Sequence, residues 1–263
     1  LGRITGGGIF GESQKLGLEP AWRESGVFGC DSVQAVEYHG RLFWMWGDTT
    51  LARYPLGVFH MTAARTEVRP LQPQPIPPIR LNYELFRDAE GQPRPVATMS
   101  GEGPTWLAGL IVLPDAKGRD HLVAAFAKIK PPQTAYETGL CAWDDQLERF
   151  APVAIRWRAG AGQGGEKPPL MPDGHAVIAG DAEGRRWVYF GNPLPTLRCP
   201  ATFEAWSDPS CWEALPAPKQ LPIAGSDALV TPHGGSLAWH PWRQKWVTIF
   251  TQWGGKGSLL GEI

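Results

Sequence analysis

Four apolar, strand-like segments each end on a residue that can carry charge or form hydrogen bonds. When the segments are aligned on these ends, the residues in register are Asp48, Lys128, Asn192 and Gln252. A carboxylate placed in a binding site can transfer protons to or from a bound molecule, and an amide can bind its hydroxyl groups. The four positions therefore point to a polar binding site in which acid–base chemistry is available.

The elements that would position these residues are hairpins. Each hairpin has a short apolar strand, a turn rich in glycine or charged residues, and a second apolar strand, expected at residues 32–48, 106–128, 175–192 and 235–252. Helical periodicity is nearly absent, and further strands are expected at 57–64, 139–144 and 151–157. We therefore predict an all-β fold, with residues 1–263 forming a single β-propeller domain in which about four blades are visible. A β-sandwich or an irregular meander is the alternative.

In a four-stranded blade, the first strand begins on the face where the second strand ends. Residues that precede or open the first strands are Asp31, Trp106, His175 and His233, and the third strands add Glu137, Arg198 and Glu262. Trp253, at a strand end, could stack on a ring in the same way as Trp106. This mixture of carboxylates, histidines, amides and aromatic rings suits a neutral polyhydroxylated ligand better than an anion.

Each of these residues also has a structural interpretation. Asp48, in the run Gly47-Asp48-Thr49, could cap a turn, and Asp31 could be an ordinary turn residue. Glu137 could be a solvated residue at a sheet edge, and most of the 13 tryptophans are expected to pack between blades. The shared register of the polar residues is what favours a site.

The composition excludes two classes of partner. Lys and Arg number 25 against 26 Asp and Glu, so a net charge of −1 leaves no basic surface for nucleic acid or an anionic membrane. No apolar run approaches the roughly 18 residues that a membrane span needs.

With 32 glycines and 26 prolines the chain is rich in turns. Residues 70–78 and 158–174 are expected to be long loops between blades.

The four cysteines lack the spacing of a metal site. Cys199 and Cys211 could pair in an oxidising compartment, or all four could be small buried residues. We expect no catalytic metal and no cofactor, although Ca²⁺ could bind at the propeller axis without a D-x-D-x-D-G loop. The compartment stays open, with a secreted or periplasmic location favoured.

Aligned in this way, the chain resembles the five-bladed β-propeller glycosidase superfamily, which includes arabinanase-like and sucrose-hydrolase-like proteins. The likeness is greatest to glycosidase-like members with Gly-Asp-Thr after a hydrophobic second strand, here Leu42 to Thr49. Residues 187–193 and 246–250 add to it. The family has five blades where four are visible here, the last incomplete, so a final blade is expected beyond Ile263.

The resemblance implies a carbohydrate substrate and an active site in a central funnel. One carboxylic acid would protonate the leaving oxygen, and a second carboxylate would act as nucleophile or activate water. On this view Asp31 and Asp48 form the nucleophile or base and its partner, and Glu137 or Glu262 is the acid. The residues implied to bind sugar or stabilise charge are Trp106, Lys128, His175, Asn192, Arg198, His233, Gln252 and Trp253. A carbohydrate-binding propeller without catalysis, or a structural propeller that binds other proteins, would account for the same pattern.

Overall fold

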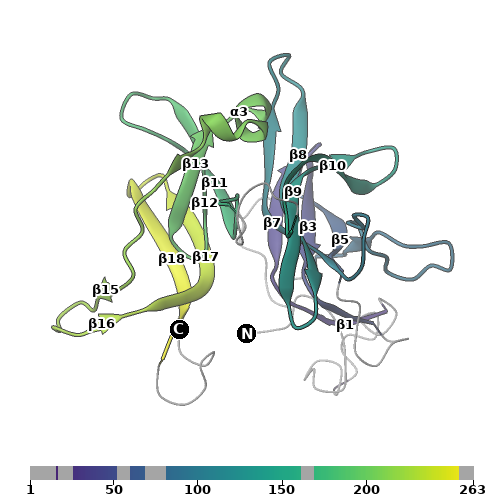
Figure 1. Cartoon of the computed structure of the whole chain (residues 1–263), viewed down its shortest axis with the longest axis horizontal. Coiled ribbons are helices and arrows are strands. Elements are labelled where there is room, and N and C mark those ends of the chain that lie inside the picture. Colours follow the sequence, from purple (N-terminus) through teal and green to yellow (C-terminus); the bar gives the residue numbers. More distant parts are fainter. Residues whose placement is uncertain (1–15, 17–25, 52–59, 69–80, 161–168, 255–263) are drawn as a thin grey trace. The chain divides into compact units, whose positions relative to one another are not determined.

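A computed structural model of the chain describes residue 16 and residues 26–51, 60–68, 81–160 and 169–254 (Figure 1). These residues form eighteen β-strands, one short helix, α3 (Phe203–Ser207), and one 3₁₀ turn, η1 (Pro209–Cys211). All strand pairs within the named sheets whose register is defined are antiparallel. The all-β prediction is confirmed. No helix among the described residues is long and apolar enough to cross a membrane.

The first four-stranded sheet has the order β2-β3-β5-β6. Its strands are β2 (Gln34–Tyr38), β3 (Arg41–Trp46), β5 (Thr62–Glu67) and β6 (Glu84–Leu85). The hairpin β2–β3 closes through His39 and Gly40, whose φ angles of 50° and 72° are both left-handed. Two consecutive left-handed residues match the right-handed twist of the flanking strands. This is the first of the predicted hairpins.

A small two-stranded sheet lies next to this one in the chain. It pairs β1 (Val27–Cys30) with β4 (Thr49–Leu51), so that Cys30 faces Thr49. The sequence pattern did not predict this pairing, and it brings the residues that follow β1 to the residues that precede β4.

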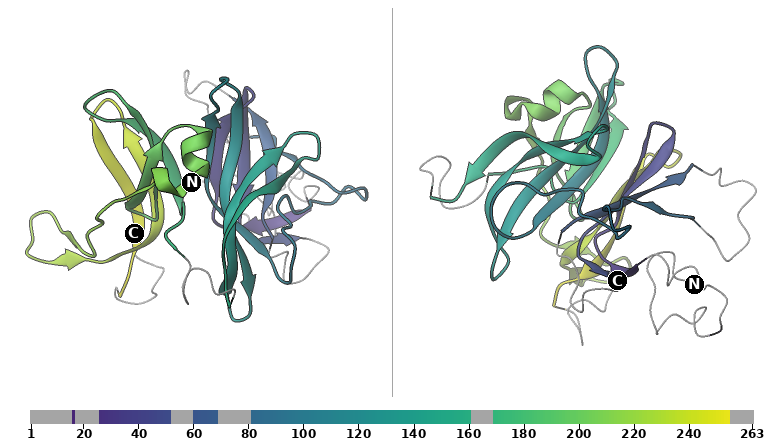
Figure 2. Two further views of the ribbon diagram at one scale, coloured as in Figure 1. Left: turned by 45° about the horizontal axis from the view of Figure 1, so that its top comes forward. Right: turned by 90° about the vertical axis from the view of Figure 1, so that its right-hand side faces the viewer.

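The second four-stranded sheet contains the longest strands and has the order β10-β9-β8-β7 (Figure 2). Its strands are β7 (Thr105–Pro114), β8 (Asp120–Lys130), β9 (Thr134–Asp144) and β10 (Arg149–Arg158). Side chains of the central strand β8 are buried on both faces, with Leu122, Val123 and Ala124 fully covered. Continuous burial explains the uninterrupted apolar run from residue 122 to residue 127.

The third four-stranded sheet has the order β11-β12-β13-β14. Its strands are β11 (His175–Gly180), β12 (Arg186–Gly191), β13 (Pro195–Pro200) and β14 (Glu213–Ala214). Helix α3 and η1 connect its last two strands, and the Thr202 side chain caps α3 by accepting from the Ala205 amide. In all three large sheets the strands lie in the order in which they occur in the sequence, although in the first sheet β4 lies outside that order and pairs with β1.

The last strands form two-stranded sheets. They pair β15 (Leu221–Pro222) with β16 (Leu229–Val230), and β17 (Pro232–His240) with β18 (Lys245–Gln252). β17 lies against β11. Within the described residues β18 pairs only with β17, and several of its apolar side chains are exposed, among them Val247 and Ile249. The fourth predicted hairpin is therefore present, without further strands among the residues described.

Three turns share the sequence Asp-Ala-X-Gly, beginning at Asp88, Asp115 and Asp181. In each, the glycine amide donates to the carbonyl of the aspartate three residues earlier, and the glycine has a left-handed φ. The aspartate carboxylate accepts from the amide four residues on, at 2.7–2.9 Å. In the β7–β8 and β11–β12 hairpins that residue is an arginine, which also pairs with the aspartate. The carboxylate therefore closes the turn from inside.

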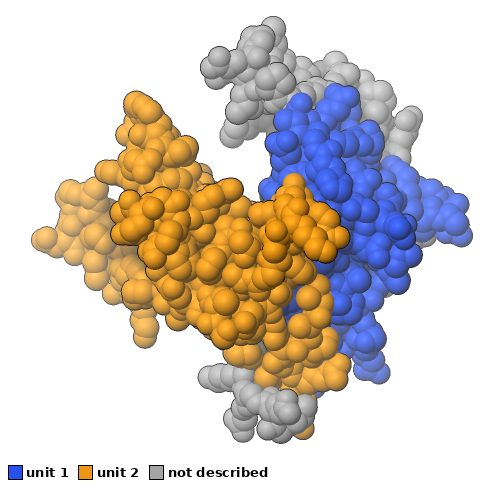
Figure 3. Space-filling view, turned by 90° about the horizontal axis from the view of Figure 1, so that it is seen from above, with its two compact units in different colours: residues 1–107, 126–152 blue, residues 108–125, 153–263 orange. Residues whose placement is uncertain are grey.

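The chain divides into two compact units (Figure 3). Unit 1 comprises Leu1–Leu107 and Phe126–Pro152, and unit 2 comprises Ala108–Ala125 and Val153–Ile263. The core of unit 1 contains an aromatic cluster of Phe43, Phe86, Trp143 and Phe150, with ring centroids 4.8–6.1 Å apart. The Arg65 guanidinium lies 4.8 Å from the centroid of the Phe86 ring.

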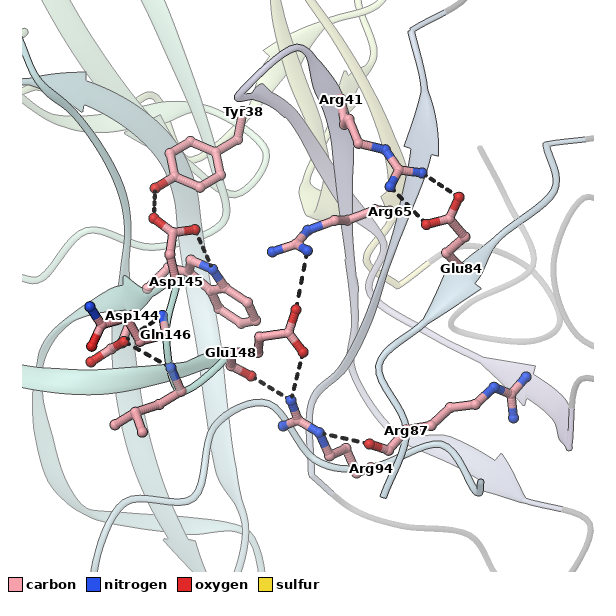
Figure 4. Close-up of polar contacts among 12 residues, drawn as sticks. Tyr38, Arg41, Arg65, Glu84, Arg87, Arg94, Asp144, Asp145, Gln146 and Glu148 are labelled. Atoms are coloured by element: carbon pink, nitrogen blue, oxygen red, sulfur yellow. Dashed lines mark hydrogen bonds and ion pairs between the residues drawn. The ribbon is translucent and has the colours of Figure 1, made fainter. Parts of the chain in front are cut away.

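Polar contacts join the same strands of unit 1 (Figure 4). The Tyr38 hydroxyl donates to Asp145 at 2.8 Å, and Arg65 and Arg94 both pair with Glu148. These bonds join strands β2 and β5, and the segment after β6, to the turn between β9 and β10. Inter-sheet packing therefore uses several of the arginines and aromatic residues of unit 1.

The predicted loops are only partly described. Residues 70–78 lie outside the described residues, as do 161–168 of the second loop. β10 continues to Arg158, and residues 169–174 contain no strand. All four cysteines are free thiols, and burial raises the pKa of Cys199 to about 12.

Candidate functional site

The backbone brings Asp31 and Asp48 together. Each follows or precedes one strand of the β1–β4 pair, so the pairing continues into them. The Asp31 amide donates to the Asp48 carbonyl at 3.2 Å, and the Gly47 amide donates to the Asp31 carbonyl at 2.9 Å. The prediction that these two residues are neighbours is confirmed, and β1–β4 pairing is the cause.

Gly47 makes room for the Asp31 side chain. A Cβ atom at position 47 would overlap Oδ1 of Asp31, so the carboxylate lies directly against the glycine backbone. Next in the chain, the Thr49 hydroxyl donates to the Gly47 carbonyl at 2.9 Å and is bonded to the Thr62 hydroxyl at 2.8 Å. The Gly-Asp-Thr motif thus provides space for one carboxylate, carries the second, and fixes the backbone between them.

Asp48 is in an environment that favours its protonated form. Partial burial is the main cause, and the negative charge of Asp31 adds to it, so the pKa of Asp48 is raised. A hydrogen bond from the Trp106 side chain acts in the opposite direction but does not cancel the shift. Two neighbouring carboxyl groups whose environments differ can serve as acid and base in one reaction.

Lys128 is the most deeply buried cation described. Its side chain is near the end of β8, the residue is 1% exposed, and Nζ donates to the Gly103 carbonyl at 2.7 Å. Burial lowers its pKa, which the negative charge of Glu137 partly offsets. Glu137 is itself buried. The structure therefore brings Lys128 and Glu137, two predicted site residues, within electrostatic range of each other.

The loop before β7 is attached to the same end of this sheet. The Tyr136 hydroxyl donates to the Glu102 carbonyl at 2.7 Å, next to the carbonyl that Lys128 binds. Burial raises the pKa of Tyr136, and the charges of Glu137 and Glu102 raise it further. The negative charges of both carboxylates therefore raise the pKa of the same hydroxyl group, that of Tyr136.

His60 completes the polar groups of unit 1 near Lys128. Burial lowers its pKa, and the charge of Lys128 lowers it further, while a bond to the Ala97 backbone has the opposite effect. Its buried Nδ1 has no hydrogen-bond partner among the residues described. At neutral pH this imidazole is uncharged.

In unit 2, the register places His175 beside the end of β12. His175 is opposite Gly191, the residue before Asn192, as the hairpin predicted. Burial lowers the pKa of His175. The Asn192 side-chain oxygen accepts from the Gly235 amide at 3.0 Å, so this amide links the third hairpin to the fourth.

The fourth hairpin brings together its own predicted residues. Gln252 is opposite Pro232, the neighbour of His233. The His233 ring contacts the Thr251 hydroxyl at 3.3 Å, and its centroid is 4.6 Å from that of the Trp253 ring. Trp253 is 52% exposed, so about half of its surface is open to solvent.

Arg198 is placed differently from the prediction. The expectation that it opens its strand is wrong, because β13 begins at Pro195 and Arg198 is the fourth residue. It faces Tyr189 across β12, pairs with Glu213 at 2.6 Å, and lies 4.1 Å from the centroid of the Trp187 ring. These contacts engage the guanidinium on the sheet. Glu137 is likewise the fourth residue of its strand, β9.

Two further predictions concern Glu262 and a metal site. Glu262 lies outside the described residues. Among those described, no group of three or more histidine, cysteine, aspartate or glutamate side chains could hold a metal ion.

Sequence reasoning missed three residues of unit 1: His60, Glu102 and Tyr136. Glu102 had a signal, since the run Gly101-Glu102-Gly103 places a lone carboxylate between two glycines just before a strand. Tyr136 is adjacent to the predicted Glu137 but on the alternate side of the strand pattern. His60 falls within the strand expected at 57–64, but β5 begins at Thr62, so His60 precedes the strand and strand alternation gave no signal for it.

No protein-family model matches the sequence, and no curated protein sequence matches it significantly. Among solved structures, the chain is similar to a putative glycosidase from Bacteroides thetaiotaomicron VPI-5482. The sequence identity is 11% and the TM-score 0.45, covering 89% of this chain and 64% of that one. It is also similar to a glycosyl hydrolase from Bacteroides ovatus, with 10% identity and a TM-score of 0.41, covering 87% and 61%. The chain thus spans less than two thirds of the length of either structure.

Proposed function

We propose that the protein is a glycoside hydrolase and that Asp31 and Asp48 in unit 1 are its reacting carboxyl groups. The observation that carries the proposal is the environment of Asp48. Its carboxyl group is partly buried, lies beside Asp31, and has a raised pKa. A carboxylic acid whose pKa is raised, next to a second carboxylate, is what cleavage of a glycosidic bond requires.

In this mechanism Asp48 donates a proton to the leaving oxygen. Asp31 acts as the nucleophile or as the base that activates water, and its position depends on the space over Gly47. The Trp106 side chain, which binds Asp48, orients the acid. Glu137 remains the alternative acid, because it is buried and near the ammonium group of Lys128.

The residues of unit 2 are proposed to bind sugar. His233 and the exposed Trp253 form a ring pair on which a pyranose or furanose could stack, and Asn192, His175 and Gln252 offer hydrogen bonds to hydroxyls. We also propose that the sheets are blades of a β-propeller. Three of them are four-stranded meanders in sequence order, as propeller blades are.

A carbohydrate-binding protein without catalysis is the second candidate. The observation in its favour is Trp253, an aromatic side chain that is half exposed beside His233. On this view Asp31 and Asp48 would have only a structural role, and their substitution would leave glycan binding intact.

The test measures reducing-sugar release from a panel of polysaccharides by the native protein, Asp31→Asn and Asp48→Asn. Loss of one reacting carboxyl group is expected to lower the rate at least about 100-fold. Asp227→Asn, at an exposed aspartate, is the control and is expected to keep full activity. Undiminished activity in both site variants would remove the assignment of these residues. Glycan binding without any release by the native protein would favour the binding protein.

A further inference from the structure

The loop before β7 is held in one conformation by its own glycines. Gly101 and Gly103 have φ angles of 102° and 73°, which other residues rarely adopt. A Cβ atom at position 101 would lie 2.6 Å from the Tyr136 hydroxyl, and one at position 103 would overlap the Ile129 carbonyl. Glu102 is thus carried between two positions that accept only glycine.

Two side chains from neighbouring strands then bind consecutive carbonyls of this loop. Tyr136, from β9, donates to Glu102, and Lys128, from β8, donates to Gly103, both at 2.7 Å. Burying an ammonium group is costly unless hydrogen bonds compensate it. A fully buried lysine therefore holds this short loop in place by a hydrogen bond to its backbone, which indicates that the position of the loop matters.

The Glu102 side chain itself is not used by the fold. It is exposed, and its carboxylate makes no hydrogen bond or ion pair within the described part of the chain. Its charge reaches the Tyr136 phenol together with that of Glu137. Four residues later in the chain comes Trp106, whose side chain binds Asp48. The glycine-flanked loop thus presents the Glu102 carboxylate, which has no partner in the described part of the chain, from the segment that leads to Trp106 and so to Asp48.

We propose that Glu102 is a specificity-determining residue that accepts hydrogen bonds from two adjacent hydroxyls of a neutral sugar. Lys128 and Tyr136 are positioning residues, because they act on the substrate only through the loop. This inference rests on the proposed function. A carboxylate has two oxygens spaced to accept from neighbouring hydroxyl groups.

The charges of unit 1 determine the substrate class. Four carboxyl groups belong to the proposed site, from Asp31, Asp48, Glu102 and Glu137. Among the described residues, the cation whose side chain binds the loop that carries Glu102 is Lys128, and burial, together with the charge of this lysine, lowers the pKa of His60 and favours a neutral ring. A sugar with a carboxylate or sulfate would be repelled. The substrate is therefore a neutral glycan.

The experiment compares native protein with Glu102→Gln on neutral glycans (xylan, arabinan and β-glucan), with polygalacturonate as the acidic glycan. Weakening charged hydrogen bonds made in both the ground state and the transition state is expected to raise KM about tenfold or more with little change in kcat. Glu90→Gln, at another exposed glutamate of unit 1, is the matched control and is expected to leave KM unchanged. Glu102→Lys is expected to reduce the preference for neutral over acidic glycans.

Tyr136→Phe tests the positioning role, since it removes only the bond to the Glu102 carbonyl. A rise of about threefold in KM, at unchanged kcat and thermal midpoint, is expected, and Glu102→Gln should abolish any added effect of Tyr136→Phe. Native kinetics in Glu102→Gln, while Asp48→Asn is inactive, would overturn this inference and leave the proposed function standing. If the native protein binds glycans without cleaving them, the same comparison is made on the dissociation constant. Equal affinity of native protein and Glu102→Gln would again overturn it.

Discussion

The Asp48 carboxyl group is ionised at neutral pH in an unfolded chain, whereas burial and Asp31 raise its pKa in the folded protein. A carboxyl group with a raised pKa stabilises the fold fully at pH values below its unfolded pKa, and that contribution is lost as the pH rises through the folded pKa. At pH 7 the charged form of Asp48 therefore opposes folding. The same property suits it to donate a proton, so a requirement of catalysis is met at the expense of stability.

Asp48→Asn is expected to separate these two effects. An amide keeps an oxygen for the Trp106 hydrogen bond but carries no charge, so the variant should unfold at a midpoint up to a few degrees (~1–3 °C) above the native protein at pH 7. The gain should shrink as the pH is lowered toward about 4, where the native carboxyl also becomes protonated. Thermal unfolding followed by circular dichroism at several pH values measures both. A lower midpoint than the native protein at pH 7 would contradict this account.

Gly47→Ala tests the contact between the Asp31 carboxylate and the glycine backbone. The added methyl would displace the end of a short side chain rather than backbone, so the cost in stability is expected to be small, about 1 kcal/mol or less. Activity is expected to fall about tenfold or more, because a reacting group displaced by about 1 Å loses its alignment.

Gly29→Ala is the matched control, since no atom lies within 4 Å of a Cβ atom at that position of β1. Turnover and unfolding are measured for both variants. Equal activity in the two would show that Asp31 need not lie against Gly47.

At the scale of elements, the sequence predicted what depends on neighbouring residues. The hairpins were found from strand alternation and turn residues, which are local signals. The β1–β4 pair was missed because strands of four and three residues give no periodic pattern, and its partners come from either side of a whole hairpin. The start of β13 was misplaced, because the sequence pattern put Arg198 at the opening of a strand that begins at Pro195, where proline is tolerated as the first residue.

The Asp-Ala-X-Gly turns are expected to make the fold sensitive to acid. Burial would raise the pKa of Asp181, but hydrogen bonds from Trp187 and Arg185 outweigh it and hold the pKa well below its usual range. The stability that Asp181 contributes is present above its unfolded pKa and is lost as the pH falls through the folded pKa. Asp181→Asn should therefore be less stable than the native protein at pH 7, with a difference that narrows below about pH 4.

Urea unfolding at pH 7 and pH 3 measures this difference, and Asp227→Asn serves as a control at an aspartate for which the structure shows no such hydrogen bonds. A constant difference at both pH values would mean that the charge of Asp181 does not contribute.

Strand β18 is expected to promote self-association. Its apolar side chains Val247 and Ile249 are 42% and 61% exposed, and within the described residues one of its edges is unpaired. An exposed apolar edge strand can pair with another chain, and a charge on it blocks the pairing. Ile249→Lys should therefore shift the protein toward monomer in sedimentation velocity runs at increasing concentration. Gln244→Lys, in the preceding turn, adds the same charge and should not.

At the scale of the molecule, the candidate site depends on contacts that the sequence pattern reaches only in part. The hairpin register correctly brought Asp31 to Asp48, and His233 to Gln252. It could not find Glu102 or His60, since residues in loops have no register, and their neighbours come from strands up to several tens of residues away. The site of unit 1 is held together at the end of the second large sheet where β7 begins, β8 ends and β9 begins.

The burial of Lys128 also makes this residue a reporter. An amine-reactive label can modify a lysine only when its Nζ is accessible, and Lys128 is 1% exposed in the folded protein. Its modification then requires the end of β8 to open, so the labelling rate follows local unfolding rather than amine chemistry. Labelling of the native protein followed by mass spectrometry should modify the exposed Lys117 within minutes and Lys128 far more slowly. Low concentrations of urea should raise the labelling rate of Lys128 but not that of Lys117. Equal labelling rates of the two lysines in the native protein would mean that the end of β8 opens freely. The lysine that fixes the loop would in this way also record how often the loop is released.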